Sequence, residues 1–205
     1  MLERLIVFVE EESAEAALHA ILPKLLPGLG FQIIRFQGKQ NLLRNLPARL
    51  RGFKSWLPEG WLLLVLVDRD NDDCRDLKQS LEAIASQAGL RSKSAVTGGT
   101  RFQILNRIAI EELESWFFGD WEAVCLAYPK APRHIPVKHQ YRDPDAISGG
   151  TWEALERILQ AKGYFPAGLG KIELARSVAL HMEPSRNTSR SFQVFREALG
   201  AAAAL

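Results

Sequence analysis

Three acidic side chains follow strongly apolar segments, at positions where a strand would end. Glu10 comes directly after residues 5–9, and Asp68 and Asp70 come after residues 61–67. If these two strands are neighbours in a parallel sheet, the three carboxylates converge on one edge of it. In an extended chain Asp68 and Asp70 point the same way, which suits the binding of one or two ions. Carboxylates that close repel one another, and a bound hard cation or a raised pKa relieves the repulsion.

The residue types favour Mg²⁺ or Mn²⁺ as the ion. The ligands offer only oxygen, and neither His nor Cys belongs to the set, which argues against zinc. Capping of the next helix is the alternative for any acid after a strand. We prefer that alternative for four neighbouring acids, which are Glu11, Glu12, Asp72 and Asp73. For Glu10, Asp68 and Asp70 we prefer the metal.

A further acidic cluster lies in the segment IAIEELESWFFGD, residues 108–120. We expect a helix over residues 109–118, with an apolar stripe that passes through Leu113 and Trp116. Glu114 flanks this stripe, and Glu111 lies one turn back on the same side. Glu112 points elsewhere, and we expect it on a solvated face. Glu114 is therefore the acid expected at a buried margin.

The elements that position these acids alternate between strands and helices. We expect strands over residues 5–9, 31–36, 61–67 and 101–108, and helices over residues 13–26, 40–57, 73–88 and 109–118. Ser13 is expected to cap the first helix, and Pro47 to break or restart the second. This alternation predicts an α/β fold with a mainly parallel, Rossmann-like sheet flanked by helices.

The last third of the chain has a different pattern. Residues 128–150 are loop-like, and helices are expected over residues 152–162, 171–182 and 192–203. We therefore divide the chain into an α/β core, residues 1–127, and a loop and α-helical C-terminal appendage, residues 128–205.

The formal charge is only +2, from 26 Lys and Arg against 24 Asp and Glu, which argues against a strongly basic nucleic-acid surface. The charges are segregated, however, since residues 16–58 hold seven basic residues and no acid. An acidic centre loaded with cations would become positive, so the total understates the affinity for phosphate. Two cysteines without a disulfide framework and no stretch of about 18 apolar residues favour a cytoplasmic protein without a membrane span.

A Glu after the first strand and an Asp-x-Asp after a later one resemble the Toprim fold of topoisomerases, primases and overcoming-lysogenisation-defect nucleases. Val9-Glu10-Glu11 keeps the Glu of the first motif, with Glu11 in place of its usual Gly, and Asp68-Arg69-Asp70 matches the second. The segments FVEEESAEAAL, FQGKQNLL, VLVDRDNDDC, NRIAIEELESWFFGD, DPDAISGGTWEALERIL and SRSFQVF together resemble a bacterial family of uncharacterised, Toprim-related proteins. A phospho-receiver, with acids after its first and third strands, is a competing interpretation.

The resemblance implies a Mg²⁺-dependent nuclease, or another enzyme that processes phosphodiester bonds in DNA or RNA, in a phage-defence system. Glu10 would act as general acid/base or ligand, Asp68 and Asp70 would bind metal, and Glu114 with Glu111 would complete a two-metal site. Candidates for phosphate or substrate contacts are Arg190, Lys171, Arg69 and Lys39. The alternative is a non-catalytic effector or regulatory module that works with a partner ATPase. The choice between DNA and RNA and the oligomeric state, including a homo-oligomer, are left open.

Overall fold

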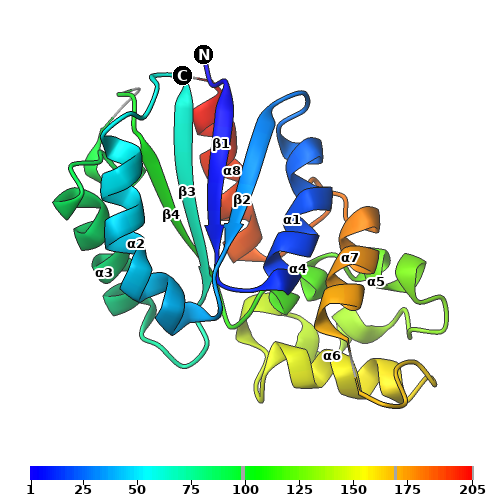
Figure 1. Cartoon of the computed structure of the whole chain (residues 1–205). Coiled ribbons are helices and arrows are strands. Elements are labelled where there is room, and N and C mark those ends of the chain that lie inside the picture. The colour runs from blue at the N-terminus through cyan, green and yellow to red at the C-terminus, as the bar shows by residue number, and fades with distance from the viewer. Residues whose placement is uncertain (98–99, 169, 205) are drawn as a thin grey trace.

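Four parallel strands form one sheet in the computed structural model, which describes residues 1–97, 100–168 and 170–204 (Figure 1). The strands are β1 (Arg4–Val9), β2 (Gly30–Arg35), β3 (Trp61–Asp68) and β4 (Ile104–Ala109). Their order across the sheet is β2-β1-β3-β4, so β1 and β3 occupy the centre. The predicted α/β class with a parallel sheet is confirmed.

The central strands are apolar on both faces because helices cover both faces of the sheet. Leu5, Val7 and Val9 pack into one hydrophobic cluster, which includes α1 (Glu12–Leu25). Ile6 and Phe8 point to the opposite face, where they pack against α2 (Lys39–Lys54) and α3 (Cys74–Gln87). Figure 1 shows α2 and α3 on one side of the sheet and α1 and α8 on the other.

The strand order reverses between β1 and β3. Helix α1 carries the chain from β1 outward to β2, and α2 then returns it across β1 to β3 on the other face. In open parallel sheets this reversal is the topological switch point, where ligands bind outside the carboxyl ends of the strands. The residues that follow β1 and β3 therefore occupy the position where function is expected.

The C-terminal helices share the hydrophobic cluster of the first face. They are α4 (Glu114–Gly119), α5 (Trp121–Ala127), α6 (Thr151–Gln160), α7 (Lys171–His181) and α8 (Arg190–Ala203). Helix α7 packs along α1, and α8 packs against β4 and α1. The ammonium of Lys24 in α1 holds the end of α7 against α1 by donating to the carbonyl oxygens of Leu180 and Met182, each at 2.8 Å. No helix among the described residues is both long enough and apolar enough to span a membrane.

The prediction of a helix over residues 109–118 is wrong for the first half of that segment. Strand β4 continues to Ala109, which pairs with Asp68, and Glu111 has a φ of +61°. The backbone N–H groups of Arg69 and Asp70 donate to the carbonyl oxygens of Ala109 and Glu111, each at 2.8 Å. These bonds from the residues that follow β3 prevent residues 109–111 from adopting a helical conformation, and helix α4 begins only at Glu114.

Two smaller predictions, about a break in one helix and the cap of another, are also wrong. Pro47 lies inside an unbroken α2, because Leu42, Leu46 and Leu50 are fully buried on both sides of it and hold both halves against the sheet. Ser13 does not cap α1. Its hydroxyl donates to the carboxylate of Glu11 at 2.5 Å, and the helix begins at Glu12.

Candidate functional site

Glu10 and Asp68 meet at the carboxyl ends of the two central strands. Val9 pairs with Leu66 in the parallel β1–β3 register, so the residues that follow are neighbours. The backbone N–H of Asp68 donates to Oε1 of Glu10 at 2.5 Å. Both side chains are buried, with relative exposures of 7% for Glu10 and 9% for Asp68. The sheet therefore brings together the two acids at the switch point.

Asp70 lies at the margin of this pair and not in an extended continuation of β3. The strand ends at Asp68, and Asp70 has a φ of +48°, so the expectation that both acids share an extended segment is wrong. The carboxylate of Asp70 is half-exposed and forms an ion pair with Nζ of Lys39 at 2.6 Å. Its negative charge is nevertheless close enough to raise the pKa of Glu10.

Glu114 reaches the same edge from the face of the sheet that α1 and α8 cover, close enough to Asp68 to raise its pKa. It is the first residue of α4 and is completely buried, with no hydrogen-bond partner for either carboxylate oxygen. The helix is held there by Trp116, whose indole N–H donates to the hydroxyl of Ser191 at 2.9 Å and whose ring packs against Phe192 of α8. A buried carboxylate without partners is costly, so this position requires an explanation.

Burial and mutual repulsion raise the pKa values of these carboxyl groups. Burial is the largest cause for Glu10, whose pKa rises to about 7 despite the hydrogen bond from Asp68 and the charge of Lys39. Burial also holds the pKa of Asp68 well above its usual range, and the carboxylates of Glu10 and Glu114 raise it further. Burial raises the pKa of Glu114 to about 7, although the charge of Lys171 lowers it. Asp68 therefore links Glu10 and Glu114 electrostatically, and we call these three residues the carboxylate unit.

Lys171 supplies positive charge to this unit from the start of α7. Its ammonium lies 4.8 Å from the centroid of the Trp152 ring and 3.9 Å from Oε1 of Glu112. Burial by itself would lower the pKa of Lys171, but the carboxylates of Glu114 and other acids raise it above its ordinary value. Of the predicted phosphate contacts, Lys171 is the one whose pKa both Glu114 and Asp68 raise, whereas Lys39 interacts with Glu10.

The other predicted cations have protein partners. Arg69 pairs with Glu111, whose positive φ turns it away from α4. Lys39 is mostly buried and bonds to Asp70 and to the carboxylate of Asp72 at 2.8 Å. Arg190 is exposed at the start of α8, with its nearest acid, Glu197, at 3.7 Å. None of these three shares an ion pair with Glu10, Asp68 or Glu114 in the described part of the chain.

Two neighbouring acids have structural roles. Asp73 caps α3, as expected, by accepting from the backbone N–H groups of Arg75 and Asp76. Glu112 was expected on a solvated face, but it accepts from the hydroxyl of Thr151 and the N–H of Trp152, each at 2.9 Å. It therefore caps α6 across 39 residues of sequence, and no local pattern could have indicated this.

Residues 9–200 match the family described as a domain of unknown function, DUF4276. The chain belongs to the DUF4276 family. No curated protein and no solved structure gives a significant match to the chain. In this DUF4276 chain the match begins one residue before Glu10 and includes Asp68, Glu114 and Lys171, so the whole carboxylate unit lies within the family region.

The donor chemistry of the carboxylate unit fits a hard divalent cation. Glu10, Asp68 and Glu114 offer only oxygen, and both oxygens of Glu114 are free of hydrogen bonds. A cation would favour the charged forms of three carboxyl groups whose pKa values are raised mainly by burial. Within residues 1–97, 100–168 and 170–204, however, no three His, Cys, Asp or Glu side chains are already arranged to hold a metal ion. The residues present suit the ion by chemical type, and their side chains would have to close on it.

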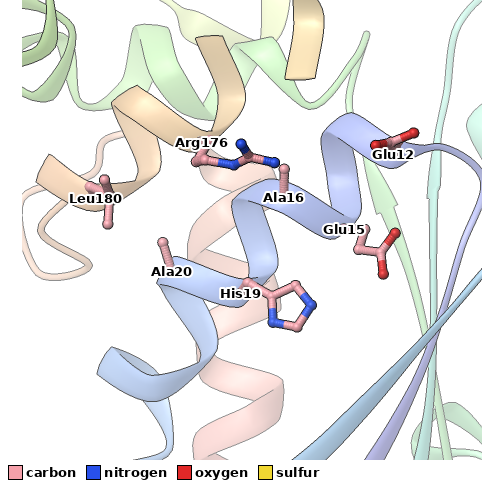
Figure 2. A pocket seen from close by; sticks show the side chains of 7 residues that line it. All are labelled: Glu12, Glu15, Ala16, His19, Ala20, Arg176 and Leu180. Carbon is pink, nitrogen blue, oxygen red and sulfur yellow. The ribbon is translucent and has the colours of Figure 1, made fainter. Parts of the chain in front are cut away.

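A separate groove of about 500 Å³ lies between α1 and α7. Figure 2 shows Arg176 projecting from α7 above α1, with Glu12 and Glu15 farther along α1. Both acids pair with Arg35 of β2, at 2.5 and 3.4 Å. Glu10, Asp68 and Glu114 do not line this groove, so it is distinct from the carboxylate unit.

Proposed function

We propose that this protein is a Mg²⁺- or Mn²⁺-dependent enzyme that cleaves or otherwise processes phosphodiester bonds in nucleic acid. One observation carries the proposal: Glu114 is fully buried with two unpartnered oxygens, beside Glu10 and Asp68 at the switch point of a parallel sheet. Structural acids are normally paired or hydrogen-bonded when buried. An arrangement that leaves three buried carboxyl groups in mutual repulsion supports a role in binding a cation and its substrate.

Glu10, Asp68 and Glu114 would hold the ion, with Asp70 at the margin. A bound divalent ion would lower the pKa of a water molecule and stabilise the leaving oxygen of a phosphodiester. Without an ion, burial raises the pKa of Glu10 to about 7, and an ion held by its carboxylate would favour the charged form, so Glu10 would serve as a ligand while the ion is bound. Lys171 can neutralise charge on a substrate phosphate beside these acids.

Nucleic acid as the substrate is supported by a row of cations on α2, which runs from this edge toward the opposite end of the sheet. Helix α2 begins at Lys39, next to Asp70, and carries four exposed basic residues, which are Arg44, Arg49, Arg51 and Lys54. No ion pair joins these four to an acid in the described residues, so they are available to phosphates. The resemblance to Toprim-related nucleases supports the same substrate and, with it, a cytoplasmic role in phage defence, where a partner ATPase would belong.

The test is cleavage of labelled single-stranded DNA, double-stranded DNA and RNA by the purified protein, with Mg²⁺, with Mn²⁺ and with a chelator. We expect divalent-dependent cleavage that falls by about 100-fold or more in Glu10→Gln and in Asp68→Asn. Glu59→Gln is the matched control. Glu59 is an exposed acid just before β3, at the opposite end of the sheet, and this variant should keep its activity.

Divalent-dependent cleavage that survives both Glu10→Gln and Asp68→Asn would refute the site. Binding of Mn²⁺, followed by its paramagnetic resonance, separates the remaining outcomes. Metal binding that is lost in both variants, without cleavage of any substrate, would favour the non-catalytic effector that works with a partner. An absence of both metal binding and cleavage would refute the proposed function.

A further inference from the structure

A second cavity lies on the other side of β4, away from the carboxylate unit. It has a volume of about 350 Å³, is open to solvent, and is lined by α3, the outer edge of β4 and the start of α8. This volume is within the range of small-molecule sites, about 300–1,000 Å³. Most of its lining is apolar, with contributions from Ile108, Ile110 and Val194. Neither Glu10 nor Asp68 reaches it.

Three cations line this cavity, and one of them has no acid partner. Lys78 pairs with Glu82 at 2.7 Å, and Arg190 is near Glu197 at 3.7 Å. Arg107 forms no ion pair with any described residue. It donates to the carbonyl oxygen of Asn106 at 2.8 Å, while its Nε is buried without a partner. An under-partnered arginine in a mostly apolar wall favours an anionic ligand.

Asp145, the acid among the lining residues, is hydrogen-bonded at the start of α8 and is not a partner of Arg107. Asp145 accepts from the hydroxyls of Ser189 and Ser191 at 2.8 and 2.9 Å and from the N–H of Ser191 at 3.0 Å. Its carboxylate is therefore engaged in holding the start of α8. Burial lowers the pKa of Arg107, and the one acid that opposes this shift is Glu82. Among the residues that line the cavity, Lys78, Arg107 and Arg190 carry positive charge and Asp145 carries negative charge.

Asn106 adds a second unpartnered group to the lining of the cavity, on the opposite face of β4 from Arg107 because neighbouring residues of a strand point to opposite faces. Its amide nitrogen donates to Oε1 of Glu82 at 3.1 Å, which fixes the orientation of the amide. Its Oδ1 is buried and accepts no hydrogen bond. A ligand that pairs with these groups needs an anionic group for Arg107 and an N–H donor for Oδ1 of Asn106. It also needs a flat apolar part that packs against Ile108 and Ile110. A nucleotide combines these three features.

We propose that this cavity binds a mononucleotide, with its phosphate at Arg107 and its base against the apolar wall beside Asn106. The site is independent of the proposed function, because it needs neither the carboxylate unit nor a metal. Its occupant would contact β4, whose Ala109 pairs with Asp68, so the ligand would bind next to the carboxylate unit without reaching it.

The test is binding of AMP, GMP, CMP and UMP to the full-length protein by calorimetry, with a chelator present. We expect at least one of them to bind with a Kd below about 1 mM. Arg107→Gln should weaken this binding by about tenfold or more. Val194→Phe keeps every cation but narrows the cavity, and it should weaken binding even where Arg107→Gln disturbs folding. Arg176→Gln, on the α1–α7 groove, and Glu10→Gln should bind as the wild type does.

Cys74 gives a second readout because it lies in the cavity wall and is partly exposed, whereas Cys125 is buried. The bound nucleotide should slow alkylation of Cys74 by a maleimide. Failure of all four nucleotides to bind at about 1 mM would overturn the proposal. Undiminished binding in both Arg107→Gln and Val194→Phe would do the same. Equal binding and equal Cys74 protection by inorganic phosphate would overturn the assignment to a nucleotide.

Discussion

The backbone N–H of Asp68 donates to the carboxylate of Glu10 at 2.5 Å and joins the end of β3 to the residue after β1. The bond favours the charged form of Glu10, while burial favours the neutral form more strongly, so the pKa still rises to about 7. One oxygen of Glu10 is thereby fixed in place by the sheet itself. Two of the three acids of the carboxylate unit lie at the ends of sheet strands, which would suit the positioning of a reacting group.

Glu114→Gln should stabilise the protein at about pH 8. The pKa of Glu114 is raised from 4.5 in the unfolded chain to about 7 in the folded protein. As pH rises through this window the unfolded chain loses its proton first, so the free energy of unfolding falls. The full cost above pH 7 is about 3 kcal/mol, and below pH 4.5 both states keep the proton and the cost disappears. Urea unfolding of both proteins at about pH 5 and pH 8 measures the difference.

Glu197→Gln is the control for this experiment, because Glu197 is an exposed acid on α8. Its free energy of unfolding should match that of the wild type to within about 0.5 kcal/mol at both pH values. A Glu114→Gln protein that is less stable than the wild type at the higher pH would contradict the electrostatic account of this site.

Divalent cations should raise the melting temperature of the wild-type protein at about pH 8. A ligand at 100 times its Kd stabilises the folded state by about 2.7 kcal/mol when it binds that state alone. The effect should disappear in Asp68→Asn, which removes a buried carboxylate from the unit. Thermal denaturation with Mn²⁺, Mg²⁺ or a chelator tests this, and an equal shift in wild type and variant would place the ion elsewhere.

Lys171→Met should raise the pKa of Glu114 further, because the charge of Lys171 lowers it in the wild type. The pH above which the destabilisation by Glu114 is complete should therefore move upward and its full cost should grow, and any cleavage activity should fall. Lys130→Met is the matched control, since Lys130 also lies over an aromatic ring, that of Tyr164, at 6.0 Å. A pH profile of stability that is identical in the two variants would show that Lys171 does not act on the carboxylates.

Asp120→Ala should destabilise the fold by about 3 kcal/mol. The side chain of Asp120 is completely buried and accepts from Nε of Arg186 and from the N–H of Glu183, both at 2.7 Å. These bonds join α5 to the segment between α7 and α8. Glu122 pairs with the same arginine at 3.3 Å but is 56% exposed, so Glu122→Ala should cost less than about 1 kcal/mol. Chemical denaturation that gives equal losses for both variants would contradict this ranking.

The strands and the fold class could be predicted from the sequence because their signals are local. Residues 5–9 and 61–67 are continuous apolar runs, and a run of that kind fits a strand buried on both faces. Glu10 and Asp68 could be selected for the same reason, since each directly follows such a run. The helix expected over residues 109–118 failed because backbone bonds from Arg69 and Asp70 decide that segment, and its own periodicity does not.

The tertiary structure alone decided which of these residues meet. The strand order places β1 beside β3, and only this pairing brings the N–H of Asp68 to Glu10. Glu114 is buried because Trp116 packs on α8, and Lys171 arrives on a helix that begins 57 residues later than α4 does. Hydrophobic periodicity reports which face of an element is buried, but it carries no information about the partner. That information arises from long-range packing, which depends on both surfaces at once.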